Sequence, residues 1–425
     1  MAYVPIAFIL AGMTAYTVLA GADFGAGLWT LLSFGSAGAS VRDHARHAMG
    51  PVWEANHVWL IFVLVVCWTG YPVAFGSITS TLAAPLLIAA IGIIFRGAAY
   101  ALRGVSGPSR FAEQLLGVGS LIAPFALGTA VGAIALGRVP VGNAAGNLVT
   151  SWLNPGAVLV GVLAVAFSGY LAAVYLAADA VRSSPERMMA SAFRTRALYA
   201  GVASGALALA GVLVMRSSGL SLLHGSALAF VIISGVAGLG TLLLCWVRRF
   251  GLARLTAALA VAAVVVGWTV AQAPRFLPGL TVTQAAADRS TLVALIIAVT
   301  CGCVVLIPSL ALLFTLFLRG RLDTPDHQAP SPPLSAAAPV AAAASMAAPP
   351  PAPGTRSRDR VRPGDAHRAI EHARRWTAAA VVGLMGGSGL LVFADATWAH
   401  ALGVVLLVLC AVSAFALAMP GPGQE

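Results

Sequence analysis

The chain is dominated by long apolar runs, most of them close to the length that a helix needs to cross a bilayer. Such a helix takes about 20 apolar residues for about 30 Å of hydrocarbon, and roughly nine runs of this kind precede residue 320. The mean hydropathy of +0.91 and the 9% of charged residues agree with this pattern. The sequence therefore predicts an all-α polytopic membrane protein.

The apolar runs are separated by short loops, which favours a bundle of antiparallel neighbours. The segments before residue 320 are about 4–32, 56–75, 82–102, 115–136, 156–178, 197–215, 226–246, 253–272 and 291–318. Two further segments, near 376–393 and 398–419, predict an additional C-terminal transmembrane hairpin.

Between these two sets the composition changes sharply. Residues 321–375 are first rich in Pro and Ala and then rich in Arg, and they lack the apolar area that would offset the entropy of ordering. We therefore expect a core over 1–320, a disordered cytoplasmic linker over 321–375 and the hairpin over 376–425. The Arg-rich part is better explained by attraction to anionic lipid than by a nucleic-acid partner.

The distribution of arginine predicts the orientation. The chain contains no Lys, and its arginines concentrate in the loops that follow the odd-numbered spans. By the positive-inside rule these loops are cytoplasmic, so the N-terminus is expected outside the membrane and the C-terminus in the cytoplasm. The opening MAYVPIAFILAGMTAY has no basic region before its apolar run, so it is expected to be a retained first span.

Most familiar catalytic and metal-binding signatures are missing from the sequence. There is no Walker loop, GxSxG elbow or HExxH pair, and Gly-rich stretches such as GVGSL and GTAVGAIALG lie inside apolar runs, where small residues permit close helix packing. The cysteines also fall in apolar runs and are expected to be buried hydrophobes, with no metal site. They are Cys67, Cys245, Cys301, Cys303 and Cys410.

A few ionisable residues interrupt the apolar runs: Asp23 in GADFGAG, Glu54 and His57 in WEANHVWL, and Arg96 in IIFRGAAYALR. At membrane depth such groups cost several kcal/mol and persist where they pair or handle protons. Asp23 should lie roughly 28 Å from the external start of its span and Arg96 roughly 21 Å from its own. All four are expected to converge near the cytoplasmic side, as a proton intake or as an internal ion pair.

Simpler explanations exist for each of these residues. Glu54 can be a helix-start carboxylate favoured by the helix dipole, and Asp23 and Arg96 can pair for structural reasons alone. His57 invites a haem-ligand role, but six-coordinate haem needs two axial side chains and the sequence offers no obvious second one. Trp53 and Trp59 suit interfacial anchoring, although Trp59 also lies on the inward part of its span.

The ordered motifs GADFGAG, WEANHVWL with YPVAF, and IIFRGAAYALR resemble subunit II of bacterial cytochrome bd-type quinol oxidases. Later stretches agree, including SWLNPGAVLVGVLAVAFSGYLAAVYLAAD, APRFLPGLTVTQAAADRSTL and LIPSLALLFTLFLRG, so the resemblance covers about residues 1–320. It implies a nine-helix core of two four-helix bundles plus a peripheral helix, located in the bacterial cytoplasmic (inner) membrane. The linker and the last two segments lie outside it.

The resemblance also implies a function. Such a subunit is inactive alone and ligates no haem, while a partner subunit I holds two b-type haems, one d-type haem and the quinol site. The complex oxidises quinol and reduces dioxygen to water with cytoplasmic protons. Subunit II stabilises its partner and helps to build a proton route, with room for a structural lipoquinone and small accessory transmembrane subunits.

By matching position, Glu54 and Asp23 are the expected proton-relay residues, and Arg96 corresponds to the arginine of the third-span motif. Trp53, Asn56, His57 and Trp59 complete the motif around Glu54 and are expected to have structural or electrostatic roles. Family members often carry an acidic residue five positions after the arginine, but here that position is Ala101. The proton route must therefore differ there or take that carboxylate from the partner.

Two other classes of function compete with this interpretation. A proton-coupled secondary transporter also places buried charges near broken helices, but the sequence shows no convincing inverted repeat. A purely structural scaffold would need only the pairing of Asp23 with Arg96. A haem-bearing partner that purifies with the chain would separate the oxidase subunit from both.

Overall fold

The structure is a computed structural model that describes residues 1–318, except for 34, 36, 37, 50–52, 107–109, 184–186, 218, 219 and 221, together with 402, 405 and 406. The chain divides into two compact units, Met1–Thr300 and Cys301–Glu425. The predicted linker and nearly all of the predicted C-terminal hairpin lie outside the described residues. The three-part division of the chain therefore stays a prediction.

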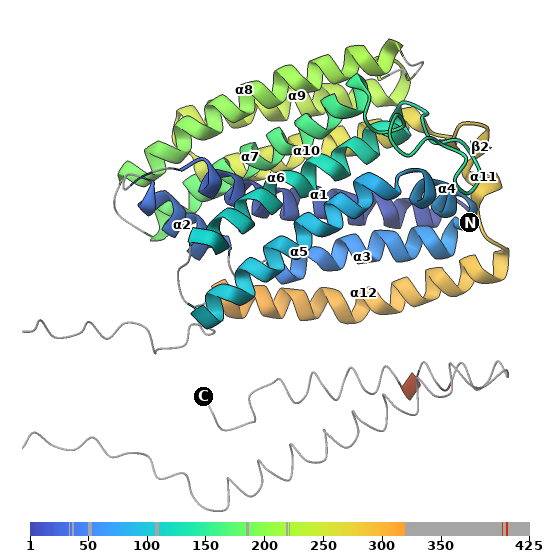
Figure 1. Cartoon of the computed structure of the whole chain (residues 1–425), viewed down its shortest axis with the longest axis horizontal. Helices are drawn as coiled ribbons and strands as arrows, with labels where there is room; N and C mark the ends of the chain where they lie inside the picture. Colours follow the sequence, from blue (N-terminus) through green and yellow to red (C-terminus); the bar gives the residue numbers. More distant parts are fainter. Residues whose placement is uncertain are drawn as a thin grey trace, which may run out of the picture. The chain divides into compact units, whose positions relative to one another are not determined.

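The described part of the first unit and the helix that leaves it are almost entirely helical (Figure 1). The helices are α1 (Val4–Leu31), α2 (Ala39–Met49), α3 (Trp53–Gly70), α4 (Pro72–Thr81), α5 (Ala83–Ser106), α6 (Arg110–Ala135), α7 (Pro155–Ser183), α8 (Arg187–Ser217), α9 (Gly225–Trp246), α10 (Phe250–Gln272), α11 (Val282–Ala285) and α12 (Arg289–Leu318). Seven described helices are long and apolar enough to cross a membrane, and α3 and α12 contribute shorter apolar stretches. Each segment predicted before residue 320 coincides with one of these helices, except that 56–75 covers most of α3 and the start of α4. The all-α polytopic class is confirmed.

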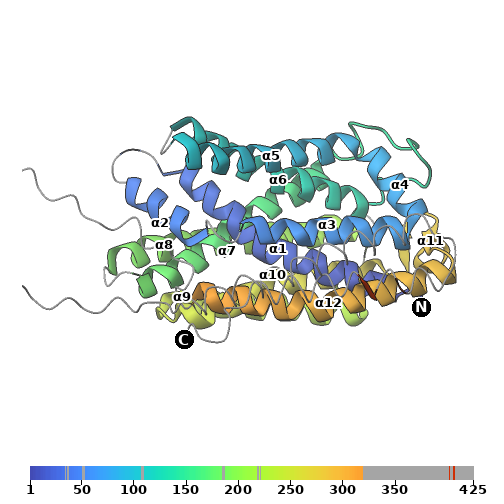
Figure 2. The ribbon, with the colours of Figure 1, turned by 90° about the horizontal axis from the view of Figure 1, so that it is seen from below.

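The helices of the first unit pack in two groups. In the first group α5 packs on α6, and α1 packs against α3 and α6 (Figures 1 and 2). In the second group α7 packs against α8 and α10, and α9 packs against α10. Contacts of α7 with α1 and α6 join the two groups. This grouping agrees with a pair of four-helix bundles, while the exact nine-helix arrangement stays a prediction.

Local chemistry explains where the second predicted span ends. The segment expected at 56–75 breaks at Tyr71, where the backbone turns to φ −140° and a separate helix, α4, begins at Pro72. Proline has no N–H to donate and disfavours helical geometry in the residue before it, so α3 cannot continue. The Gly70 carbonyl at the break accepts a hydrogen bond from the Ala287 N–H at 2.8 Å.

The elements that the sequence did not predict include a strand pair and helix α2, both in predicted loops. Strands β1 (Arg275–Leu277) and β2 (Leu280–Thr281) form a small antiparallel hairpin around Gly279, whose φ of +76° suits glycine. The other element is α2, within an Arg- and His-rich stretch. It buries Val41 and Ala45, which lie four residues apart on one helix face. Two apolar side chains among many charges give too weak a periodicity to predict a helix.

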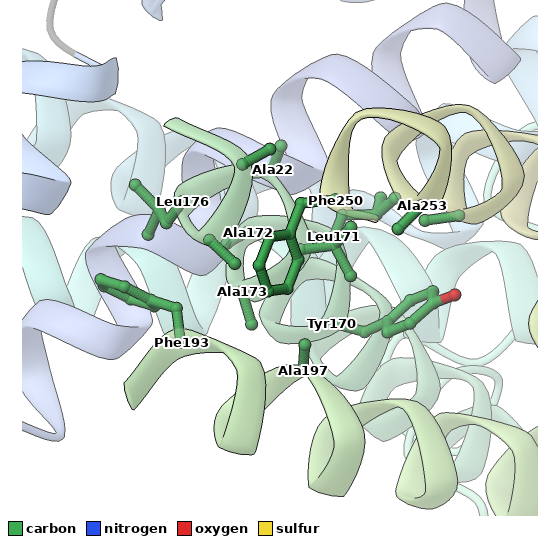
Figure 3. Packing of buried hydrophobic residues seen from close by; sticks show 14 of the residues in the cluster. Ala22, Tyr170, Leu171, Ala172, Ala173, Leu176, Phe193, Ala197, Phe250 and Ala253 are labelled. Carbon is green, nitrogen blue, oxygen red and sulfur yellow. The ribbon is translucent and has the colours of Figure 1, made fainter. Parts of the chain in front are cut away.

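The core of the second group is built largely from alanine and leucine of α7. Leu171, Ala172 and Ala173 are fully buried among residues of α1, α8 and α10 (Figure 3). Membrane helices associate through close packing rather than through exclusion of water, because lipid tails are as apolar as leucine. Alanine lets the backbones approach, so the Ala-rich sequence of α7 suits its position between the two groups.

Glycines on α1 permit its contact with α7. A methyl group at Gly25 would lie 1.8 Å from the Ser168 carbonyl oxygen, and one at Gly21 would lie 3.3 Å from Leu171. Gly21 and Gly25 are four residues apart, so they share one face of α1 and form a small-xxx-small motif against α7. Any larger residue at Gly25 would push the two helices apart.

We predict that Gly25→Ala lowers the thermal melting temperature of the detergent-solubilised protein. The added methyl overpacks the α1–α7 contact, which costs about 1–3 kcal/mol in a well-packed core. Gly205→Ala in α8 is the matched control, because a methyl there meets nothing within 4 Å and should be neutral or stabilising. Equal melting temperatures for the two variants would contradict the close contact of α1 with α7.

Candidate functional site

The centre of the candidate site is an ion pair between α1 and α5. Arg96 Nη2 lies 2.6 Å from Asp23 Oδ1, and each side chain is only 1% exposed. Neither charge has access to water in the described part of the chain, so each depends on the other for compensation. Separating a buried pair leaves an uncompensated charge and costs about 3–5 kcal/mol.

A third helix completes the support of Arg96. Its Nη1 donates a hydrogen bond to Ser120 Oγ on α6, and Ser120 in turn donates to the Leu116 carbonyl at 2.6 Å. A methyl at Gly27 would lie 2.0 Å from Ser120 Oγ and 2.9 Å from Arg96 Nη1. Gly27, one turn after Asp23, therefore gives the guanidinium room to reach Ser120.

Aromatic side chains surround the ion pair. The Arg96 guanidinium lies 4.8 Å from the centre of the Phe24 ring, within the range of a cation–π interaction. Tyr16 packs edge-on against both Phe24 and His57, each at a ring distance of 6.3 Å. Trp59 packs against the same small cluster. The aromatic side chains thus lead from the α3 motif to the buried charges.

The register of α1 against α3 places the tryptophan motif at the depth of Asp23. The two helices run antiparallel, since Gly70 lies beside Pro5, Gly12 beside Phe62, and Asn56 donates from Nδ2 to the Leu19 carbonyl at 3.4 Å. Because the helices are antiparallel, the residue two positions before Asn56 on α3, which is Glu54, lies opposite the residue about two positions after Leu19 on α1, which is Gly21.

The backbone of Glu54 is therefore level with Gly21, about 3 Å in depth from Asp23. The side chains of Trp53 and Glu54 lie outside the described residues. Their expected roles accordingly stay predictions.

Several polar atoms at the site lack a hydrogen-bond partner within the described residues. They include both carboxylate oxygens of Asp23, whose Oδ1 contacts Arg96 as an ion pair, together with Arg96 Nε and Nη2 and the Tyr16 hydroxyl. Because Oδ1 faces Arg96, Oδ2 is the carboxylate oxygen left to accept a hydrogen bond from water or from a neighbouring acid. A buried polar atom without a hydrogen-bond partner costs free energy. A cluster of such atoms therefore marks this point as a candidate functional site.

The structure brings together most of the residues that the sequence selected. Asp23 and Arg96 are in direct contact, and Asn56 and His57 pack about one to two turns away along α1. The sequence did not predict Ser120 as a hydrogen-bond partner of Arg96, because a single serine in a stretch such as GVGSL is typical of small residues that pack between helices. Phe24 and Tyr16 were missed for a similar reason, since aromatics in an apolar span are usually core residues.

The described residues contain no group of three or more His, Cys, Asp or Glu that could hold a metal ion. His57 packs against Tyr16, whereas His44 on α2 lies 3.1 Å from the Leu176 carbonyl and 3.7 Å from Asp179. These two histidines belong to different surroundings. No axial pair for haem is formed by the side chains described here.

We predict that Asp23→Leu and Arg96→Met are each strongly destabilising, by about 3–5 kcal/mol, because each leaves one charge buried and unpaired. The double variant should recover most of the loss, since apolar residues of similar size replace the whole pair. The melting temperatures of the four proteins in detergent test this coupling. Additive losses would contradict a direct pair.

Comparison with known proteins identifies the family. The family model described as cytochrome bd terminal oxidase subunit II matches residues 1–317. The cytochrome bd ubiquinol oxidase subunit 2 of Bacillus subtilis (strain 168) is 30% identical over 113 residues, which are 26% of this chain and 33% of that protein. The match thus spans about a third of the length of that relative.

A solved structure supports the fold. The bd oxidase from Geobacillus thermodenitrificans superposes with a TM-score of 0.63 at 24% identity, covering 75% of this chain and 98% of the matched chain. At this identity the likeness concerns the fold alone. Together with the seven apolar helices, the match over residues 1–317 shows that this multi-pass membrane protein belongs to the cytochrome bd terminal oxidase subunit II family.

Proposed function

We propose that the chain is subunit II of a terminal quinol oxidase, in which it stabilises a haem-bearing subunit I and helps to deliver protons for the reduction of dioxygen to water. The observation that carries the proposal is the Asp23–Arg96 pair, buried where a membrane helix would otherwise exclude both charges. Family membership makes an oxidase complex its setting. The subunit would be inactive alone.

Proton delivery needs acceptors spaced along a path. Glu54, at the start of α3, is the first candidate. Its backbone is level with Gly21 of α1. This level is near the end of α1 that the arginine pattern predicts to be cytoplasmic. Asp23 is the second, because its Oδ2 has no hydrogen-bond partner among the described residues while Oδ1 faces Arg96. Arg96 holds the carboxylate in place through its ion pair with Oδ1.

The path then continues into the partner. Ala101, which stands where relatives often carry an acid, is exposed on α5 in the isolated chain. An exposed alanine leaves space for a side chain from another subunit, so the missing carboxylate is proposed to come from subunit I. The haems, two of b-type and one of d-type, are likewise proposed to lie in subunit I.

The structural lipoquinone would need an apolar channel for its isoprenoid tail. A shallow, open depression lies between α1 and α10, lined by small and aliphatic side chains such as Ala11, Ala15 and Ala262. Thr14 brings a hydroxyl group that has no hydrogen-bond partner among the described residues. These residues fit a hydrocarbon chain, and we place the tail of the lipoquinone there.

The described charges support the proposed orientation. Arg42 on α2 lies 3.5 Å from Glu113 at the start of α6, and Arg194 at the start of α8 donates to carbonyls at the end of α9. These positions share the end of the first unit that the positive-inside rule assigns to the cytoplasm. The N-terminus is accordingly proposed to lie outside.

The rival function, a proton-coupled secondary transporter, has no support in the comparisons. Purification separates the two functions directly. The full chain carrying an affinity tag should bring down a haem-bearing partner with reduced-minus-oxidised absorption bands. A chain that purifies alone or with haem-free proteins would refute the assignment to an oxidase complex.

For the relay we predict that Glu54→Gln lowers quinol-dependent oxygen consumption of the assembled complex, by roughly 100-fold or more, because a positioned proton-transfer group is lost. The haem content per complex should stay normal. Glu113→Gln is the matched control, since Glu113 forms an ion pair with Arg42 and is not a member of the proposed relay. Unchanged turnover in a fully assembled Glu54→Gln complex would show that Glu54 is not in the route.

A further inference from the structure

The turn between α9 and α10 carries two adjacent arginines, Arg248 and Arg249, whose side chains form no ion pair or hydrogen bond within the described residues. Both are exposed. Neither α9 nor α10 contains an Asp or Glu, so this helical hairpin offers the two cations no acidic side chain of its own. The charge of the turn is therefore available to an anionic partner.

The backbone of the turn would accept glycine more readily than arginine. Val247 caps α9, the Arg248 N–H donates to the Cys245 carbonyl, and the Arg249 N–H donates to the Leu244 carbonyl. This is a Schellman motif, in which the residue at the position of Arg248 adopts a left-handed conformation and is usually glycine. Arg248 has a φ of +61°, a left-handed conformation that costs free energy for any residue with a Cβ. An arginine is nevertheless present at this position.

An aromatic residue beside the turn is held in a fixed position. Arg194 of α8 donates from Nε to the Cys245 carbonyl and from Nη2 to the Trp246 carbonyl, both at 3.0 Å. Its guanidinium also lies 5.1 Å from the centre of the Trp246 ring. Arg194 is thus occupied by α9, while the indole stays 65% exposed. Tryptophan in such a place suits the headgroup level of a membrane.

Apolar side chains lead away from the turn on both helices. On α9 the exposed residues Leu239, Leu243 and Trp246 share one face, and on α10 the exposed residues Leu252, Leu255 and Leu259 share another. The surface thus combines two free cations with apolar stripes that run toward the bilayer interior. A phospholipid has this distribution in complementary form: an anionic headgroup above hydrocarbon chains.

We propose that the α9–α10 turn binds the headgroup of an anionic phospholipid, with Arg248 and Arg249 contacting its phosphate, Trp246 lying beside the glycerol region and the leucine stripes contacting the acyl chains. Charge complementarity favours a lipid over an acidic protein surface, because the stripes next to the arginines face hydrocarbon. The proposal does not depend on the proton route.

The test uses the purified full-length complex in detergent and titrates it separately with phosphatidylglycerol, phosphatidylcholine and inorganic phosphate while the melting temperature is followed. Phosphatidylglycerol should raise the melting temperature of the wild type, and phosphatidylcholine and phosphate should not. The double variant Arg248→Gly, Arg249→Ala should need about tenfold or more phosphatidylglycerol to reach half of the maximal rise in melting temperature. This is the loss expected when two arginines are removed from an anionic surface.

Arg248→Gly alone separates binding from folding. Glycine suits the left-handed backbone, so the lipid-free melting temperature should be equal to or higher than that of the wild type, while the response to phosphatidylglycerol weakens. Arg216→Ala, an exposed arginine in the last turn of α8, is the matched control and should respond as the wild type does.

Three results would overturn the proposal. An unchanged response of the double variant would show that the lipid binds elsewhere. A full response to inorganic phosphate alone would indicate a site for free anions. Loss of the haem-bearing partner from the double variant, with the lipid response intact, would make the turn a protein interface.

Discussion

A carboxylate and a guanidinium placed together in hydrocarbon impose conditions on everything around them. Asp23 and Arg96 are 2.6 Å apart and almost fully buried, so neither can be moved without exposing the other to an apolar medium. Three helices must then meet at one point: α1 for the acid, α5 for the base, and α6 for Ser120, which accepts a hydrogen bond from Arg96. Gly27 gives them the room to do so. The packing of the first helix group is organised around this pair.

The two faces of the GADFGAG segment perform different tasks. Asp23 and Gly27 face the charged centre, whereas Gly21 and Gly25 face α7 and permit the contact that joins the two helix groups. A single stretch of α1 therefore couples the polar site to the architecture. Substitutions that loosen the α1–α7 contact are also expected to disturb the ion pair, because the same turns of α1 carry both contacts.

In the proposed route, the ion pair and the proton relay share residues. Arg96 faces one oxygen of Asp23 and leaves the other without a partner among the described residues. The antiparallel register of α1 and α3 brings the backbone of Glu54 to nearly the same depth. The proposed relay would thus use a carboxylate that the ion pair already fixes in position. Ala101 is exposed, and the next carboxylate of the route is proposed to come from a partner subunit.

The sequence by itself determined the class of fold, the positions of the apolar helices and the choice of Asp23 and Arg96, because burial of charge in a membrane is costly enough to be visible in composition alone. Only the tertiary structure decided that these two residues touch, that Ser120 and Phe24 complete their surroundings, and that α3 ends at Gly70 with α4 as a separate helix. It also revealed α2, whose two buried apolar residues are too few to be read from periodicity. The physical reason is that depth along a helix follows from residue number, whereas rotation about the axis and the approach of neighbouring backbones depend on contacts between distant segments.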